Sequence, residues 1–260
     1  MKSAFGDELL PAAIETRDLS LWYGDKQALS SVTLILPEKR VTSLIGANGC
    51  GKSSLLKCFN RMTDLIPSAR VKGECLITGT NVWGAKVDVA DLRRRVGFVF
   101  QKAIPFPKSV FENVAFGLRL AGVVARDELE ERVETALVRS ALWEEVRDQL
   151  HTSARSLSGG QQQRLCLARS IAVDPQILLM DEPTRALDPI STGLIEDVIL
   201  EFKKTCTVVV ATHSLQQAAR ISDFTLFFHQ GALVEMDRTE KIFASPADRR
   251  TEDYLNCRFG

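Results

Sequence analysis

The chain has 260 residues, of which 45% are hydrophobic and 25% are charged. This length and composition are typical of one folded α/β domain, or of a core with a smaller lobe. Thirty-three basic residues balance thirty-three acidic ones. The chain therefore has no overall positive charge to attract nucleic acid, and nucleic acid is not expected as a partner.

The cysteines and the apolar segments argue against further classes of protein. Six cysteines, at positions 50, 58, 75, 166, 206 and 257, include no Cys-x-x-Cys pair, so we expect reduced thiols in a cytosol rather than metal ligands or disulfides. No apolar run approaches the roughly 18–20 residues that span a bilayer. Residues 1–11 lack the apolar stretch of a secretion signal. Work at a membrane would require docking through a partner.

Strands dominate the predicted elements of the first hundred residues. Two alternating stretches predict strands joined through Gly24 and Asp25, and a short apolar run predicts a buried strand that leads into a glycine-rich loop. The strands are expected at residues 14–23, 32–36, 41–45, 74–77 and 96–100, and a helix at residues 52–62.

A helical pattern follows between residues 102 and 155, and strands and helices then alternate again. Apolar runs at residues 177–180 and 206–211 predict buried parallel strands. Between them, Asp188 and Pro189 resemble the N-cap and first-turn proline of a helix. This order predicts a parallel-sheet core with an inserted helical lobe.

The glycine-rich segment between the strand at 41–45 and the following helix predicts a phosphate-binding loop. Its pattern is Gly-x-x-x-x-Gly-Lys-Ser, whose backbone N–H groups cradle phosphates. Lys52 would contact the phosphate oxygens, and the Ser53 hydroxyl would bind Mg²⁺. The residues expected at the nucleotide in this segment are Gly46, Ala47, Asn48, Gly49, Cys50, Gly51, Lys52, Ser53 and Ser54.

Four further residues are candidates for the same site. Asp181 ends a buried strand and could hold Mg²⁺, and Glu182 follows where a general base could polarise water. His213 follows the next apolar strand and could contact the terminal phosphate. Gln101 ends another strand and could sense that phosphate through Mg²⁺ or water.

Two aromatic residues precede the turn at Gly24. Tyr23 could stack on a purine ring, a contact that tolerates different bases. Trp22 and Tyr23 could instead be ordinary strand aromatics.

A second glycine segment, at residues 157–161, opens a predicted helix. Its serine hydroxyl, its glycine N–H groups and the positive end of the helix could bind an anion. The residues are Ser158, Gly159, Gly160 and Gln161. Because this segment cannot easily reach the phosphates held by Lys52, we expect it to face the nucleotide of a second copy of the chain.

The order of these motifs resembles that of the ATP-binding subunits of ABC transporters along essentially the whole chain. The resemblance implies a single domain over residues 1–260, with a P-loop NTPase (RecA-like) α/β core, an antiparallel β subdomain and an inserted α-helical subdomain. The core and β subdomain would cover about 12–101 and 156–260, and the helical subdomain about 102–155.

The same resemblance implies the activity and the partners. ATP and Mg²⁺ are the expected cofactors of a head-to-tail homodimer that hydrolyses ATP. Tyr23 becomes the adenine-stacking aromatic, Glu182 the base, His213 the switch histidine, and Asp188 part of the loop between the two sites. The resemblance also implies two membrane permease subunits and a position at the cytoplasmic face of the (inner) membrane.

A narrower resemblance is to the ATPase subunits of bacterial phosphate importers, carried by residues 60–67, 106–114, 159–166, 187–192 and 250–254. It implies phosphate uptake with an external phosphate-binding protein as an indirect partner. Two alternatives to phosphate import remain. The chain could serve an ABC transporter for another solute, such as an amino acid, or be a soluble ABC ATPase without a transport role. Arg185 departs from the family pattern, where serine is usual, and we hypothesise that it alters coupling between the two ATP sites.

Overall fold

The computed structural model of the 260-residue chain describes residues 10–256. The expectations about residues 1–9 and about Cys257 lie outside these described residues. The five cysteines between residues 10 and 256 are buried free thiols.

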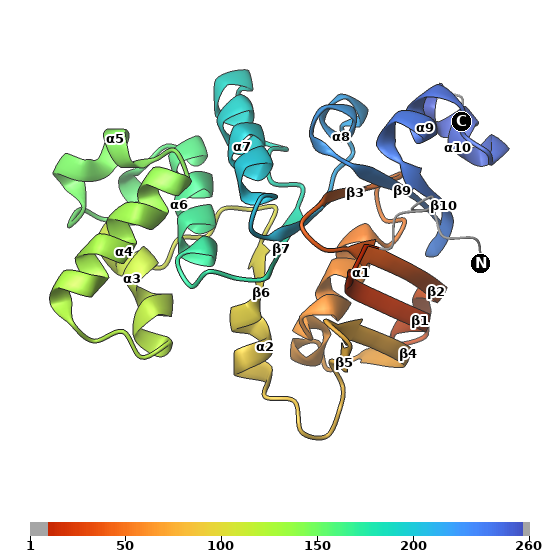
Figure 1. The fold of residues 1–260 in the computed structure, drawn as a ribbon, viewed down its shortest axis with the longest axis horizontal. Coiled ribbons are helices and arrows are strands. Elements are labelled where there is room, and N and C mark those ends of the chain that lie inside the picture. The colour runs from red at the N-terminus through yellow and green to blue at the C-terminus, as the bar shows by residue number, and fades with distance from the viewer. Residues whose placement is uncertain (1–9, 257–260) are drawn as a thin grey trace.

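Two sheets organise the described chain (Figure 1). The first is antiparallel, with the order β2-β1-β4-β5, and the second has the order β10-β9-β3-β8-β7-β6. In the second sheet the neighbours from β9 to β6 are parallel, and β10 is antiparallel to β9. The strands are β1 (Ala12–Tyr23), β2 (Lys26–Pro37), β3 (Val41–Ile45), β4 (Ala69–Ile77), β5 (Thr80–Asn81), β6 (Val96–Val99), β7 (Ile177–Asp181), β8 (Thr207–Ala211), β9 (Phe224–His229) and β10 (Ala232–Arg238).

The helices lie between the sheets, over the second sheet and in a lobe beside it (Figure 1). The α-helices are α1 (Lys52–Phe59), α2 (Val89–Arg95), α3 (Val110–Leu120), α4 (Arg126–Arg139), α5 (Trp143–Val146), α6 (Gly159–Ile171), α7 (Pro189–Phe202), α8 (Leu215–Ile221), α9 (Thr239–Ala244) and α10 (Arg249–Leu255). The short 3₁₀ turns are η1 (Met62–Leu65), η2 (Arg147–Gln149) and η3 (Ala154–Ser156).

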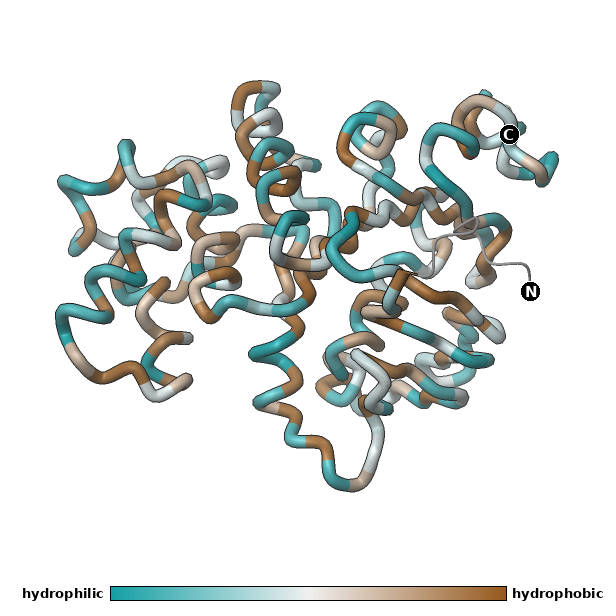
Figure 2. Tube along the Cα trace, viewed as in Figure 1, coloured by the Kyte–Doolittle hydropathy of each residue, from teal (hydrophilic) through white to brown (hydrophobic). Residues whose placement is uncertain are grey.

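The strands β3, β7 and β8 are buried at every position, as expected for parallel strands covered on both faces. Helix α1 contacts both sheets, and one hydrophobic cluster joins the antiparallel sheet to this helix and to the central strands. Figure 2 shows hydrophobic residues along the central strands, whereas they alternate with hydrophilic ones in the outer helices. The predicted antiparallel subdomain and parallel core are thereby confirmed.

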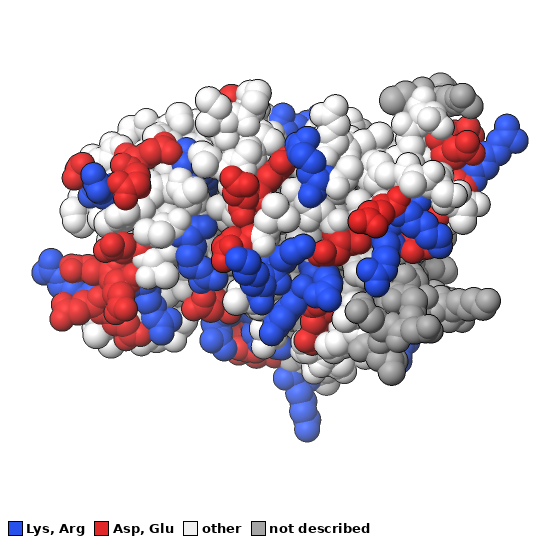
Figure 3. Space-filling view, turned by 45° about the horizontal axis from the view of Figure 1, so that its top comes forward, with Lys and Arg blue, Asp and Glu red and all other residues white. Residues whose placement is uncertain are grey.

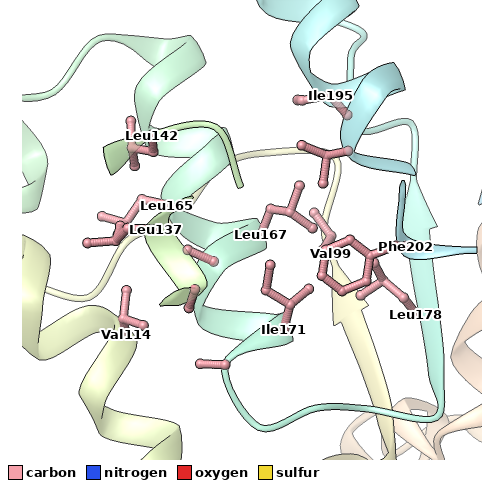
Figure 4. Close-up of a cluster of buried hydrophobic side chains, with 14 of the residues drawn as sticks. Val99, Val114, Leu137, Leu142, Leu165, Leu167, Ile171, Leu178, Ile195 and Phe202 are labelled. Carbon is pink, nitrogen blue, oxygen red and sulfur yellow. The ribbon is translucent and has the colours of Figure 1, made fainter. Parts of the chain in front are cut away.

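The helical lobe contains α3, α4 and α5, and it packs against α6. Figure 4 shows how Val114, Leu137 and Leu142 of the lobe meet Leu165 of α6. Leu167 and Ile171, farther along the same helix, continue this hydrophobic cluster toward β6, β7 and α7. A boundary of the helical subdomain near residue 155 stays a proposal, because the cluster crosses it.

Several predicted element ends are corrected by local backbone geometry. The helix expected at residues 52–62 ends at Phe59, because Arg61 adopts a left-handed φ of 58° that an α-helix does not accommodate. The strand expected at 74–77 begins at Ala69, and the strand expected at 96–100 ends at Val99.

Acidic and basic side chains are mixed over the face drawn in Figure 3, in keeping with the zero formal net charge. Among residues 10–256, none of the helices combines the length and the apolar character that crossing a membrane requires.

Candidate nucleotide site

The loop between β3 and α1 is shaped by glycines that other residues could not replace. Gly46 and Gly51 have positive φ angles of 144° and 113°. A Cβ atom on Gly46 would lie 2.2 Å from the Phe228 carbonyl oxygen, and one on Gly51 would lie 2.9 Å from the Ala28 carbonyl oxygen. The loop therefore needs glycine at both ends for conformational and steric reasons.

Lys52 lies inside this loop. Its Nζ donates to the carbonyl oxygens of Gly46 at 2.6 Å and Ala47 at 3.0 Å, and the residue is only 5% exposed. These carbonyl dipoles compensate the buried ammonium group. Ala47, Asn48 and Gly49 remain exposed at the tip of the loop, where a phosphate could approach their N–H groups.

Ser53, at the start of α1, and Asp181, at the end of β7, are in direct contact. The Ser53 hydroxyl donates to Asp181 Oδ1 at 2.8 Å. Burial raises the pKa of the Asp181 carboxyl, against the opposing effect of the Ser53 hydrogen bond. A hydroxyl and a carboxylate are hard oxygen donors, so this pair fits Mg²⁺.

Glu182 lies beside Asp181 with a side chain that is 8% exposed. Its backbone has φ of 44°, and its N–H donates to the Ala211 carbonyl at 2.8 Å, which fixes it against the end of β8. His213 Nδ1 lies 3.2 Å from Glu182 Oε2. The parallel sheet thus brings Lys52, Asp181, Glu182 and His213 to the carboxyl ends of neighbouring strands.

The positions of two other predicted residues, Tyr23 and Gln101, do not test their predicted roles. The Tyr23 hydroxyl lies 3.4 Å from the Ser54 hydroxyl, so the half-buried ring lies beside the start of α1, and burial raises the pKa of the phenol. Gln101 is exposed and makes no hydrogen bond with another described residue. Its predicted contact with Mg²⁺ stays a prediction, as does purine stacking by Tyr23.

The second glycine segment forms the N-terminus of α6. Ser158 Oγ accepts from the Gln161 N–H at 3.3 Å, and Gln161 Oε1 accepts from the Ser158 N–H at 2.9 Å. This reciprocal capping box satisfies two of the free N–H groups of the first turn. Figure 1 shows α6 beside the helical lobe, away from the loop between β3 and α1.

Asp188 caps α7 as predicted. Its Oδ1 accepts from the N–H groups of Ile190 at 3.0 Å and Ser191 at 2.9 Å, and its Oδ2 accepts from the Ser191 hydroxyl at 2.6 Å. These hydrogen bonds, led by that of the Ser191 side chain, lower the pKa of Asp188. The loop between β7 and α7 is therefore held to the start of its helix.

Three contacts around the site were not found by sequence reasoning. The Arg185 guanidinium lies 3.0 Å from Glu182 Oε2. Gln163 of α6 donates to the Phe100 carbonyl at 3.1 Å, next to Gln101. Glu145 of α5 accepts from Gln161 at 2.9 Å and also pairs with an arginine of α6. The i,i+3 spacing of Glu182 and Arg185 was a usable signal, whereas the other two contacts join distant segments and had none.

Comparisons with known proteins agree with this geometry. A family model described as ABC transporter matches residues 29–185. The chain is 56% identical over 248 residues to the phosphate import ATP-binding protein PstB of Shewanella denitrificans, covering 95% of this chain and 91% of the relative. It is 55% identical over 248 residues to PstB of Pseudoalteromonas translucida, covering 95% and 90%.

A solved structure has the same fold. It is cbiO1 from Clostridium perfringens, part of the ABC transporter complex cbiONQ, with a TM-score of 0.78 and 27% identity over 95% of this chain and 97% of that chain. The phosphate loop, the capped α6 and the paired acidic residues thus occur in a chain that these relatives match along almost its whole length. The chain belongs to the ABC transporter family, among the relatives of the PstB proteins.

Proposed function

We propose that this chain is the ATP-hydrolysing subunit of an ABC importer that takes up phosphate. The observation that carries the ATPase part is the arrangement at one sheet edge, where Ser53 is hydrogen-bonded to Asp181 and Glu182 lies beside His213. The phosphate part is supported by the identity of more than half of the residues to two PstB proteins. An importer of another solute is the remaining alternative.

The proposed chemistry assigns each side chain a task. Lys52 exchanges its carbonyl partners for phosphate oxygens, and the exposed N–H groups of the loop hold the same phosphates. Ser53, Asp181 and Gln101 would hold Mg²⁺, which offsets charge on the phosphates when bound. Glu182 accepts a hydrogen bond from the attacking water, and His213 orients Glu182 and the terminal phosphate. Tyr23 stacks on the adenine.

The active assembly that we propose is a head-to-tail homodimer. Ser158, Gly159, Gly160 and Gln161 of one copy complete the site of the other, because the N-terminus of a 13-residue helix attracts the terminal phosphate. Asp188 lies in the segment through which the two sites communicate. ATP would then hold the two copies together, and its hydrolysis would release them.

We further propose that the side of the chain formed by the helical lobe docks on two membrane permease subunits at the cytoplasmic face of the inner membrane. Residues 105–111 are one candidate surface. A groove of about 720 Å³ nearby is lined by residues of α2, β6, α3 and α6, including Phe98, Leu120 and Arg169. Leu120 is 76% exposed, so an apolar helix of a permease could cover it.

Phosphate uptake tests this proposal. Cells that lack the chain are complemented with wild type, with Lys52→Ala or with Leu120→Glu, and uptake of labelled phosphate is measured beside that of an amino acid. We expect wild type to restore phosphate uptake, Lys52→Ala to restore none, and Leu120→Glu to lose co-purification with the permease while the isolated chain keeps its ATPase activity. Restoration of amino-acid uptake alone would exclude phosphate as the cargo.

A further inference from the structure

Arg185 makes a contact with the proposed base. Its Nη1 lies 3.0 Å from Glu182 Oε2, the same oxygen that faces His213 Nδ1 at 3.2 Å. The backbone supports this contact, because the Arg185 N–H donates to the Glu182 carbonyl at 3.3 Å in a tight turn. The pair is therefore built into the segment that follows β7.

The two partners differ in exposure and in how they are held. Glu182 is 8% exposed at its side chain and is fixed by its backbone hydrogen bond to Ala211, whereas the Arg185 side chain is 43% exposed. Arg185 is thus the partner that can leave. It directly precedes residues 186–188, which include Asp188 and belong to the segment through which the two sites of the proposed dimer communicate, so closure of that dimer would change its surroundings.

The contact has a consequence for the attacking water. A general base must accept a hydrogen bond and then a proton from this water. A guanidinium on the same carboxylate opposes the hydrogen bond by occupying one carboxylate oxygen, and it opposes the proton transfer by placing a positive charge beside the carboxylate. His213 also approaches Oε2, so this oxygen has two nitrogen neighbours with which a water must compete.

We propose that Arg185 is a positioning residue that restrains Glu182 until the second copy of the chain closes on the site. This inference rests on the proposed ATPase function and refines our hypothesis that Arg185 alters coupling between the sites. The restraint keeps the uncomplexed chain at a low basal rate. Closure draws the guanidinium away and leaves Glu182 with His213 and water.

The test compares two arginines whose ion pairs have the same spacing and the same N···O distance. Arg147 Nη1 lies 3.0 Å from Glu144 Oε2, also at i,i+3 spacing, but this pair lies at the exposed end of the helical lobe. We expect Arg185→Ser to raise the basal kcat by about three- to tenfold with KM for ATP within twofold, a size fitting one partly exposed ion pair. Arg185→Lys keeps the charge and should stay nearer wild type, and Arg147→Ser should change neither constant.

A second readout does not use activity. Urea unfolding of the nucleotide-free chain is measured for Arg185→Ser, Glu182→Gln and the double variant. We expect Arg185→Ser to lower the midpoint in the wild-type background and to lower it less in the Glu182→Gln background, because their interaction is then already weakened.

The outcomes separate this inference from the proposed function. An unchanged or reduced kcat in Arg185→Ser would overturn the restraint, and so would additive midpoints in the unfolding cycle. A changed Hill coefficient with an unchanged kcat would place the effect of Arg185 at the dimer interface instead, which also overturns it. Absence of ATP turnover in wild type, or wild-type turnover in Glu182→Gln, would contradict the proposed function itself.

Discussion

Individual side chains at the nucleotide site are held by contacts within the chain. Lys52 is paired with carbonyl oxygens of its own loop, and Ser53 with Asp181. Glu182 is fixed through its backbone and faces two nitrogen groups. These contacts keep the polar groups beside the proposed nucleotide position, and Lys52 and Glu182 would exchange partners there during binding and dimer closure.

Glu182→Gln tests the role of this carboxylate at the residue scale. The amide keeps the size of the side chain but cannot accept a proton from water, so turnover should fall by about 10²-fold or more. Binding of a fluorescent ATP analogue should stay within a few-fold of wild type, since Lys52 and the loop are untouched. Turnover near the wild-type value would remove Glu182 from the role of base.

At the scale of secondary-structure elements, the N-termini of helices α6 and α7 are in contact. Gly160 in the first turn of α6 packs against Ser191 of α7, which is itself hydrogen-bonded to the cap residue Asp188. A Cβ atom on Gly160 would lie 2.4 Å from Ser191 Oγ, whereas one on Gly159 would meet nothing within 4 Å. The segment proposed to face the partner's ATP therefore packs directly against the helix that Asp188 caps.

This contact predicts opposite outcomes for two neighbouring glycines. Gly160→Ala should destabilise the chain by about 1–2 kcal/mol, because the new methyl group forces Ser191 or the helix to move. Gly159→Ala should be neutral or slightly stabilising, since alanine favours the helix and the space is open. Urea unfolding measures both variants. Equal effects would contradict the packing, and Ser191→Gly should relieve the loss in Gly160→Ala.

At the scale of the whole molecule, one ion pair joins the helical lobe to α6. Arg164 has a side chain that is 4% exposed, and its Nη1 lies 2.6 Å from Glu145 Oε1. Glu145 Oε2 also accepts from Gln161, within the segment that opens α6. The lobe is thereby hydrogen-bonded directly to a residue proposed to face the partner's ATP.

The pH dependence of stability should report this pair. The Arg164 hydrogen bond lowers the pKa of Glu145 in the folded chain, so its stabilisation is present above the ordinary glutamate pKa of about 4.3 and is lost as the pH falls further. Glu145→Gln should cost about 1 kcal/mol at pH 7, since Glu145 is partly exposed, and much less at acidic pH. Unfolding curves at both pH values measure this, with Glu144→Gln as the matched control. A cost independent of pH would contradict an ionic origin.

Local sequence patterns determined many of the strands, helix starts and loops of this protein. Continuous apolar runs predicted the buried strands, because a parallel strand is covered on both faces. The glycine spacing predicted the phosphate loop, and Asp188 followed by proline predicted the start of α7. Each of these signals lies within a few residues of the structure that it specifies. The end of α1 was predicted less well, because Asn60 and Arg61 carry no strong stop signal.

Only the tertiary structure decided which distant groups meet. Ser53 and Asp181 are 128 positions apart, and they touch because β3 and β7 flank β8 in one sheet. Likewise, no local pattern reveals that Gly160 abuts Ser191 or that Glu145 binds Arg164, since these contacts depend on how the helices pack. The sequence determined the local chemistry through short-range conformational preferences, and the order of strands and the packing of helices assembled that chemistry into a site.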